Sequence, residues 1–333
     1  MTEMNREPLL QVKNLKTYFH SMNGNIVKAV DDVSFEVYEG ETLGIVGESG
    51  CGKSITCMSL AQLVECPPGR YEGGEILLDG KDMLKVSDAE LRKMRGNVIS
   101  YIFQEPMTSL NPVFKIGFQI EEVLTLHRGL SKEEAHKEAI HALDLVRIPN
   151  PERIVNEYPF ELSGGMRQRV MIAMALACNP KILVADEPTT ALDVTIQAQV
   201  LDLMNDLKKQ LNTSILFITH DLSVIAEMAD RVMVMYAGKV VELADVMTIF
   251  ENPLHPYTKG LIASRPDMNT SSNRLTVIPG NVPDLSALPE GCSFGPRCGF
   301  FCEKCGKGVP ELVEVEPNHW VRCYRPGGED RDN

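Results

Sequence analysis

Residues whose types and spacing suit phosphate binding occur near the start of the 333-residue chain. The pattern G-x-x-x-x-G-K-[ST] is matched at every fixed position by Gly47-Glu48-Ser49-Gly50-Cys51-Gly52-Lys53-Ser54. The glycines let successive backbone N–H groups face phosphate oxygens, Lys53 brings a charge to the outer phosphates, and Ser54 offers a hydroxyl to Mg²⁺. The apolar run 42–46 before the loop and the run from Ile55 after it suit the strand and helix that such a loop requires. The sequence therefore predicts a phosphate site, against the alternative of a turn that binds nothing.

Polar residues also follow two later apolar runs. Asp186 and Glu187 come directly after 182–185, and His220 follows 215–219. Parallel strands present ligands at their carboxyl ends, so Asp186 could hold Mg²⁺, directly or through water. Glu187 could polarise a water against the terminal phosphate, and His220 could contact that phosphate. The alternatives are an acidic pair that caps a turn and a histidine with a structural role.

A second helix start could bind an anion. Ser163, Gly164 and Gly165 precede a strongly helical run that reaches residue 177, and small residues there leave backbone N–H groups accessible. The alternative is an ordinary N-cap that meets only water. Tyr18 and Phe19 lie upstream of the glycine-rich loop, where an aromatic ring could stack on a purine or simply fill a sheet edge.

The composition limits the class of protein. An apolar share of 44% is ordinary for a globular chain with a sizeable core. The net charge of −13 makes nucleic acid an unexpected partner. No apolar run approaches the roughly eighteen residues of a membrane span, and the polar N-terminus has no signal-peptide core. We therefore expect a cytosolic protein.

Strand and helix patterns place these residues on an α/β core. Short apolar or alternating runs at 26–30, 33–37 and 98–103 predict strands, the last of which ends on Gln104. Between them and the later strands, residues 119–146 predict helices, with Ser131 and Glu134 as a capping box. This part is expected to be a helical insert within the α/β core.

Cysteines gather at the end of the chain and mark a separate C-terminal module. They are Cys292, Cys298, Cys302, Cys305 and Cys323. In a reducing cytosol, such a set suits tetrahedral zinc or an iron–sulfur cluster rather than disulfides. His319 is an alternative zinc ligand, and unliganded thiols remain a further alternative.

From about Pro8 to Phe250 the chain resembles the ATP-binding subunit of an ABC transporter. The segments that match phosphate-binding motifs are the Walker A loop at Gly47–Ser54, the Q-loop at Gln104 and Walker B at Ile182–Asp186, followed by the catalytic glutamate at Glu187. An LSGGQ-type signature matches Leu162–Gly165, with Met166 in the glutamine position, and the D-loop matches Ala191-Leu192-Asp193. The switch histidine matches His220, and the adenine-stacking aromatic matches Phe19 or, less closely, Tyr18.

The resemblance implies how the site works. Ser54, Gln104 and Asp186 would organise Mg²⁺, Glu187 would activate water, and ATP would lie between two subunits arranged head to tail. Ser163 and Gly165 would then act on the ATP of the partner subunit. The second ATPase subunit could be identical or different, and the loop after Gln104 would dock on the membrane subunits.

The C-terminal part resembles oligopeptide and dipeptide importer ATPases at 252–261 and 278–283. The four-cysteine pattern of that subfamily matches Cys292, Cys298, Cys305 and Cys323, with Cys302 as an extra residue. It implies a [4Fe–4S] cluster, with Zn²⁺ as the alternative. The implied domains are an ABC nucleotide-binding domain at 8–250, with a helical subdomain at about 105–165, and an extension at 251–333.

The implied function is ATP hydrolysis that powers uptake of dipeptides or oligopeptides. The implied partners are two membrane permease subunits and an extracytoplasmic peptide-binding protein, with this chain at the cytoplasmic face of the cell membrane. Another cargo, such as nickel, a sugar or an antimicrobial peptide, is one alternative. An ABC ATPase that acts on DNA or ribosomes is another, and an inactive structural subunit is a third.

Overall fold

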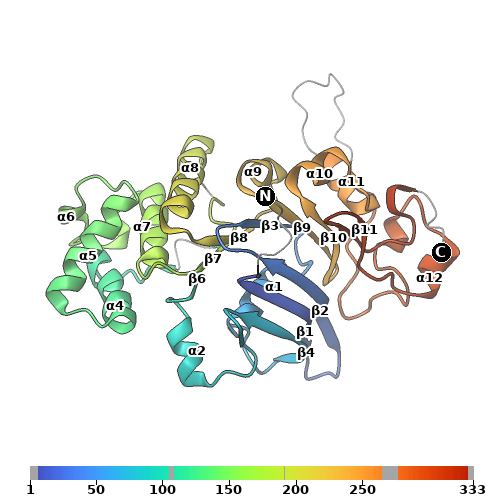
Figure 1. Cartoon of the computed structure of the whole chain (residues 1–333), viewed down its shortest axis with the longest axis horizontal. Helices are drawn as coiled ribbons and strands as arrows, with labels where there is room; N and C mark the ends of the chain where they lie inside the picture. The colour runs from blue at the N-terminus through green and yellow to red at the C-terminus, as the bar shows by residue number, and fades with distance from the viewer. Residues whose placement is uncertain (1–6, 105–108, 191, 265–276, 329–333) are drawn as a thin grey trace. The chain divides into compact units, whose positions relative to one another are not determined.

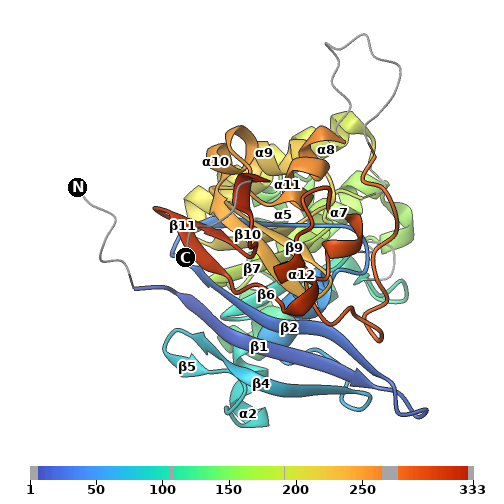
Figure 2. The same cartoon turned by 90° about the vertical axis from the view of Figure 1, so that its right-hand side faces the viewer.

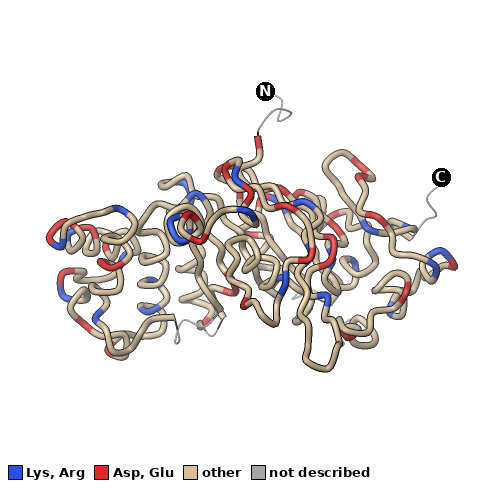
Figure 3. The backbone as a smooth tube through the Cα atoms, turned by 90° about the horizontal axis from the view of Figure 1, so that it is seen from below, with Lys and Arg blue, Asp and Glu red and all other residues tan. Residues whose placement is uncertain are grey.

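The computed structural model describes residues 7–104, 109–190, 192–264 and 277–328 (Figure 1). Two compact units divide the chain. Unit 1 comprises Met1–Glu7, Tyr38–Thr42 and Lys85–Ile218, and unit 2 comprises Pro8–Val37, Leu43–Leu84 and Thr219–Asn333. Within the described ranges, no helix combines the length and the apolar character needed to span a bilayer. Basic and acidic residues are interspersed along the described chain (Figure 3), so the net charge of −13 does not come from one acidic run.

Unit 2 contains an antiparallel sheet built from the early part of the chain. Its strands, in spatial order, are β2 (Ile26–Val37), β1 (Leu10–His20), β4 (Gly69–Leu78) and β5 (Lys81–Asp82). Figure 2 shows β1 as a long ribbon with β2 and β4 beside it. Leu10 pairs with Val37 on one side and Leu78 on the other, and all three side chains are fully buried. The runs 26–30 and 33–37 were predicted as two strands, but they form one strand, β2. Between them the backbone adopts a positive φ of 62° at Asp32 and stays within the sheet.

A second set of strands in unit 2 carries the glycine-rich loop. The spatial order is β11 (Val313–Glu316), β12 (His319–Val321), β10 (Lys239–Asp245), β9 (Arg231–Tyr236) and β3 (Thr42–Val46). Strand β3 runs parallel to β9, and the other neighbours are antiparallel. The helices are α1 (Lys53–Leu60), α9 (Leu222–Met228), α10 (Val246–Glu251), α11 (Pro256–Ala263) and α12 (Glu303–Lys307), with 3-10 turns η2 (Gly295–Arg297) and η3 (Pro326–Gly328).

The C-terminal extension is continuous with this sheet. Val321 of β12 pairs with Glu242 of β10, so the hairpin β11–β12 prolongs the sheet instead of forming a detached module. Glu242 is completely buried, and its carboxylate accepts hydrogen bonds from the backbone N–H groups of Leu254 and His255 at 2.6 and 3.0 Å. A buried carboxylate that is fully bonded in this way fixes the start of the extension on β10.

Unit 1 contains three parallel strands in the order β8 (Ser214–Ile218), β7 (Ile182–Asp186) and β6 (Ile99–Ile102). Every residue of β8 is buried, as a strand covered on both faces requires. The helices that accompany these strands are α2 (Asp88–Met94), α7 (Gly164–Leu176) and α8 (Val194–Leu211). Asp186 ends β7, so the carboxylates predicted at a strand end are placed there.

The predicted helical insert is also present in unit 1. It comprises α4 (Ile116–Arg128), α5 (Lys132–Leu145), α6 (Pro151–Ile154) and the 3-10 turn η1 (Pro159–Glu161). Helices α4, α5 and α7 pack against one another (Figure 1). Gly129, at a φ of 65°, ends α4, and the capping box predicted at Ser131 and Glu134 is confirmed at the start of α5.

Candidate nucleotide-binding site

The glycine-rich loop in unit 2 is fixed by glycines that no other residue could replace. It connects β3 to α1, as the sequence predicts. A Cβ atom on Gly47 would lie 2.3 Å from the carbonyl oxygen of Met235, and one on Gly52 would lie 2.2 Å from that of Ala29. Gly52 also has a φ of 105°, which L-residues avoid. Ser49 and Gly50, at the tip of the loop, are exposed and accessible to a ligand.

Lys53 begins α1 and turns its ammonium back over the loop. The side chain is 7% exposed, and Nζ donates to the carbonyl oxygens of Gly47 at 2.8 Å and Glu48 at 3.1 Å. The charge is therefore held close to the loop, where a phosphate-binding lysine is needed. Ser54 and Ile55 follow, half-buried, while Cys51 is completely buried beneath the loop. Burial raises the pKa of the Cys51 thiol, which keeps it uncharged.

Two further predicted residues lie in unit 2. Phe19 is half-buried on β1, whereas the hydroxyl of neighbouring Tyr18 donates a hydrogen bond of 2.6 Å to Asp31. The Tyr18 side chain is thus held by a hydrogen bond within the sheet, whereas the Phe19 side chain has no polar group to be held in this way. His220 is exposed and comes directly before Asp221, the residue whose side chain caps α9.

The acidic pair lies in unit 1, where two side chains bond the carboxylate of Glu187. Glu187 follows Asp186, and its carboxylate accepts hydrogen bonds from Gln104 Nε2 at 3.0 Å and from Thr190 Oγ1 at 2.9 Å. The backbone N–H of Glu187 donates to the carbonyl oxygen of Ile218 at 2.9 Å. Both donors bond the same carboxylate oxygen, Oε2, and so orient the side chain. Thr190 was missed from the sequence; its only signal there is the position three residues after Glu187.

The backbone of Glu187 is strained. Its φ is 47°, in the left-handed region that costs an L-residue roughly 1–2 kcal/mol. Strain of this kind persists where the surrounding structure fixes it, and it is concentrated at functional sites. Here the hydrogen bond to Ile218 supplies part of that constraint.

The predicted signature segment forms the start of α7. Ser163 is the N-cap, and its Oγ accepts a hydrogen bond of 3.3 Å from the backbone N–H of Met166. Gly164 and Gly165 are the first two residues of the helix, and a Cβ on Gly164 would meet nothing within 4 Å. The ordinary N-cap geometry is thus present, and open space above Gly164 leaves the helix start accessible.

Asp193, predicted as a D-loop residue, lies next to this helix start. Asp193 is the N-cap of α8 and accepts a hydrogen bond of 2.9 Å from the backbone N–H of Ile196. A Cβ on Gly165 would lie 2.8 Å from Cγ2 of the same Ile196, so the two helix starts are packed closely. Ala191 of the predicted D-loop, and residues 105–108 of the predicted docking loop, lie outside the described residues.

The C-terminal cysteines lie within electrostatic reach of one another in unit 2. Burial, together with neighbouring Cys292, Cys298 and Cys305, raises the pKa of Cys323 to about 12. Cys302 and Cys305 have their sulfur atoms 3.3 Å apart. Nevertheless, among the described residues no group of three or more His, Cys, Asp or Glu side chains is placed to hold a metal ion. The predicted four-cysteine iron–sulfur motif is therefore not confirmed.

Two of these thiols accept hydrogen bonds from the backbone. Cys298 Sγ accepts a hydrogen bond from the backbone N–H of Phe300 at 3.4 Å, and Cys323 Sγ accepts one from that of Arg325 at 3.3 Å. Backbone donors of this kind lower the pKa of a thiol, but burial outweighs them here and raises the pKa of both Cys298 and Cys323. A cavity of about 340 Å³ is lined by Cys292 and Cys305, together with Phe301, Glu290 and neighbouring glycines and prolines.

His319 serves a different purpose from the zinc ligand considered as an alternative. Its Nε2 lies 2.7 Å from Oε1 of Glu242, and both side chains are buried. Burial alone would lower the pKa of His319, but the hydrogen bonds and charges of Glu242 and Glu316 outweigh it and raise the pKa above its usual value. This histidine joins the hairpin β11–β12 to β10.

Comparison with known proteins agrees with this arrangement. Residues 30–190 match the family model described as ABC transporter, and residues 241–305 match that described as oligopeptide/dipeptide transporter, C-terminal region. The oligopeptide transport ATP-binding protein OppD of Bacillus subtilis (strain 168) is 53% identical over 317 residues, 95% of this chain and 88% of that protein. AppD of the same organism, described in the same words, is 54% identical over 316 residues, 95% of this chain and 96% of that protein.

Solved structures support the same assignment. The dimeric ATP-binding cassette MJ0796, bound to ADP and Pi, aligns with a TM-score of 0.63 and 31% identity, over 71% of this chain and 98% of that chain. Strand, loop and helix around Lys53, with the acidic pair after β7, define a P-loop ATPase of the ABC class. The chain belongs to the family of ABC transporter ATP-binding subunits found in oligopeptide/dipeptide importers.

Proposed function

We propose that this ATPase powers the uptake of dipeptides or oligopeptides. The observation that carries the proposal is the similarity over 95% of the chain to proteins named for oligopeptide transport, which includes the C-terminal extension. Nickel, a sugar or another cargo would use the same ATPase chemistry, since the cargo is bound by other subunits. Work on DNA or ribosomes is the alternative outside transport.

The predicted residues around the nucleotide receive roles in this proposal. Lys53 and the amides of the loop, apart from that of Glu48, hold the phosphates of ATP, and Phe19 stacks on the adenine. Ser54, Gln104 and Asp186 organise Mg²⁺, directly or through water, and Mg²⁺ neutralises charge on the phosphates. Because Gln104 donates its Nε2 to Glu187, its amide oxygen is the atom left to face the metal.

Glu187 is the proposed general base. Its carboxylate, held by Gln104 and Thr190, removes a proton from the water that attacks the terminal phosphate. His220, exposed at the start of its loop, contacts that phosphate and reports its presence.

The proposed assembly is a head-to-tail pair of ATPase subunits, identical or different. Ser163 and Gly165 contact the ATP of the partner subunit, and Asp193 lies beside them. The pair binds two permease subunits at the cytoplasmic face of the membrane, and an extracytoplasmic binding protein delivers the peptide. Two aromatic rings that follow the predicted docking loop support a docking surface: Phe114 and Phe118 are stacked at 4.8 Å and are 43% and 49% exposed. The proposed domains remain 8–250 and 251–333.

Uptake by cells tests the cargo directly. Cells that lack this chain should fail to accumulate labelled dipeptides or tetrapeptides, and the wild-type chain should restore uptake. The Glu187→Gln variant, produced at the same level, is the matched control and should not restore it. Normal peptide uptake in the deletion strain, together with loss of nickel uptake, would contradict the proposed cargo and identify nickel instead.

We also propose that Cys292, Cys298, Cys305 and Cys323 bind a [4Fe–4S] cluster, with Zn²⁺ as the alternative. Protein purified without oxygen should be brown, contain about four irons and four sulfides per chain, and lose visible absorbance with dithionite. Cys298→Ser should lose most of the iron, whereas Cys302→Ser should keep it. Colourless protein with one zinc per chain would support the alternative, and metal-free protein would leave five thiols.

A further inference from the structure

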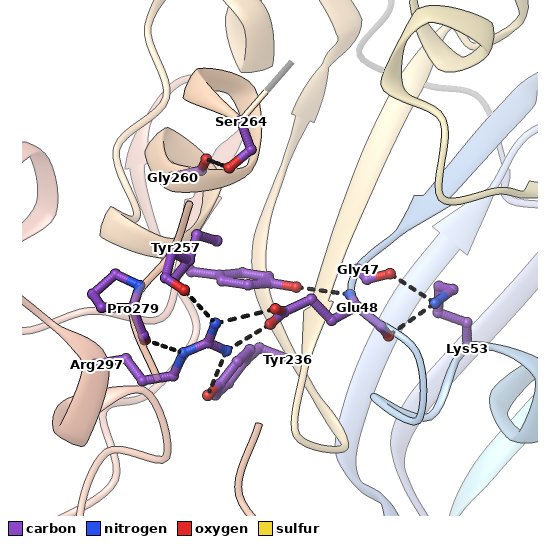
Figure 4. A network of polar contacts seen from close by, with 10 residues as sticks. Gly47, Glu48, Lys53, Tyr236, Tyr257, Gly260, Ser264, Pro279 and Arg297 are labelled. Atoms are coloured by element: carbon purple, nitrogen blue, oxygen red, sulfur yellow. Dashed lines mark hydrogen bonds and ion pairs between the residues drawn. The ribbon is translucent and has the colours of Figure 1, made fainter. Parts of the chain in front are cut away.

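The C-terminal extension reaches the glycine-rich loop through Arg297, as Figure 4 shows. Its Nη1 and Nη2 lie 2.6 and 3.1 Å from the two carboxylate oxygens of Glu48, a bidentate ion pair. Nε donates to the carbonyl oxygen of Pro279 at 2.9 Å, and Nη2 also donates to that of Ile278 at 3.3 Å. Nη1 also lies 3.4 Å from the hydroxyl oxygen of Tyr236, and the Arg297 side chain is only 4% exposed, so it is a buried group whose five N–H donors all have partners.

A second residue of the extension holds the same part of the loop. Tyr257 of α11 is completely buried, and its hydroxyl accepts a hydrogen bond of 2.8 Å from the backbone N–H of Glu48. Its ring packs against Tyr236 and Phe294 at centroid distances of 4.7 and 5.5 Å. The packing of its ring therefore holds the hydroxyl in place.

Glu48 connects these contacts to Lys53. Its carbonyl oxygen accepts the hydrogen bond from Lys53 Nζ, its N–H is bonded to Tyr257, and its carboxylate is paired with Arg297 (Figure 4). All three polar groups of one loop residue are thus fixed, two of them by the extension. The N–H of Glu48 is consequently committed to Tyr257 rather than directed at a phosphate.

The charge of Glu48 makes this pairing consequential for a nucleotide. A carboxylate within a loop that binds a polyanion repels it, and the effect is strong in a partly buried setting. The Glu48 side chain is 31% exposed, so solvent screens it only in part. Arg297 neutralises this carboxylate and keeps it on the side of the extension.

We infer that Arg297 and Tyr257 are positioning residues for the phosphate-binding loop, which make the C-terminal extension part of the ATP site. They act through Glu48 and contact no substrate. This inference rests on the proposed role of the loop, and it deepens that role by adding residues 209 and 249 positions away from Glu48. Since Arg297 directly precedes Cys298, the cysteine segment and the phosphate-binding loop are held together.

Nucleotide binding to the purified full-length chain tests the inference. Arg297→Ala should raise the Kd for Mg·ATP about tenfold, which corresponds to about 1.4 kcal/mol, because it leaves the Glu48 carboxylate unpaired beside the phosphates. In the assembled transporter, KM for ATP should rise similarly, while kcat at saturating ATP should stay within about threefold. Arg297→Lys keeps the charge without the bidentate geometry, so its Kd for Mg·ATP should lie between those of the wild type and Arg297→Ala.

A double substitution separates charge from packing. Glu48→Gln combined with Arg297→Ala should bind ATP within about threefold of the wild type, because no unpaired carboxylate remains. Tyr257→Phe removes only the hydroxyl that accepts the Glu48 N–H, and it should raise the Kd for Mg·ATP about threefold. This variant keeps the inference testable if Arg297→Ala does not fold. An unchanged Kd in both Arg297→Ala and Tyr257→Phe would overturn the inference.

Two controls distinguish the possible failures. Lys259→Ala removes another cation of the extension, bonded to the carbonyl oxygen of Gly327 at 2.9 Å, and should leave the Kd unchanged. Weakening equal to that of Arg297→Ala would show a general loss of structure and overturn the inference. Lys53→Ala should weaken ATP binding by about 10- to 100-fold; if it binds ATP normally, the proposed role of the loop itself is wrong.

Discussion

Glu187→Gln should bind Mg·ATP with wild-type affinity in the assembled transporter but hydrolyse it at least about 100-fold more slowly, the usual contribution of a general base. Glutamine keeps the length of the side chain and one carbonyl oxygen, so a hydrogen bond from Gln104 or Thr190 can be retained. What it lacks is the basic oxygen that accepts a proton from water. Steady-state phosphate release and equilibrium ATP binding, measured on the same preparation, separate the two effects.

The same variant tests the proposed dimer. With hydrolysis blocked, bound ATP should hold two ATPase subunits together, which light scattering after size exclusion would detect as a doubled mass. Asp206→Asn is the matched control, since it also removes one negative charge from unit 1, at an exposed carboxylate paired with Arg147. Its ATPase rate should equal that of the wild type. Full ATPase activity in Glu187→Gln would remove this residue from its role.

Local sequence patterns predicted the elements that carry the site. The loop from Gly47 to Ser54 required a strand before it and a helix after it, and β3 and α1 are there. The capping box at Ser131 and Glu134 is also an interaction between near neighbours, and it forms as predicted. Such features depend on residues a few positions apart, which is why their sequence spacing is informative.

Contacts between distant residues could not be predicted in this way. Gln104 and Glu187 are 83 positions apart, and Arg297 and Glu48 are 249 apart, so no spacing links either pair. Both contacts arise because tertiary packing brings strand ends and loops together. Proline and cysteine content suggested a separate C-terminal module, yet β12 pairs with β10, because a short edge hairpin has few sequence signals of its own.

The resemblance to a family predicted some of these distant residues and not others. It directed attention to Gln104, whose residue type alone predicts no site, and the structure brings Gln104 to Glu187. It also implied a role for four cysteines, whose side chains lie near one another without forming a metal-binding group among the described residues. Arg297, between two of those cysteines, has a clearer structural partner than they do.

Lys53→Ala should weaken binding of Mg·ATP by about 10- to 100-fold, because a hydrogen bond to a charged group contributes roughly 1.5–3 kcal/mol. The ammonium also bonds the carbonyl oxygens of Gly47 and Glu48, so the substitution removes two contacts that hold the loop in addition to the charge. Lys53→Arg should not restore binding, since a planar guanidinium does not fit a side-chain site that is 7% exposed. Isothermal titration with Mg·ATP at low temperature measures both variants.

A control variant and measurements of thermal stability complete the test of Lys53. Lys259→Ala removes a lysine of unit 2 that bonds a backbone carbonyl far along the chain from the loop, and it should bind ATP as the wild type does. ATP should raise the Tm of the wild type and of Lys259→Ala, since a ligand that binds only the folded state stabilises it, and should leave the Tm of Lys53→Ala almost unchanged. If Lys53→Ala binds ATP within about twofold of the wild type, the loop at Gly47–Ser54 is not the phosphate site, and the roles given to Ser54, Glu48 and Arg297 fail with it.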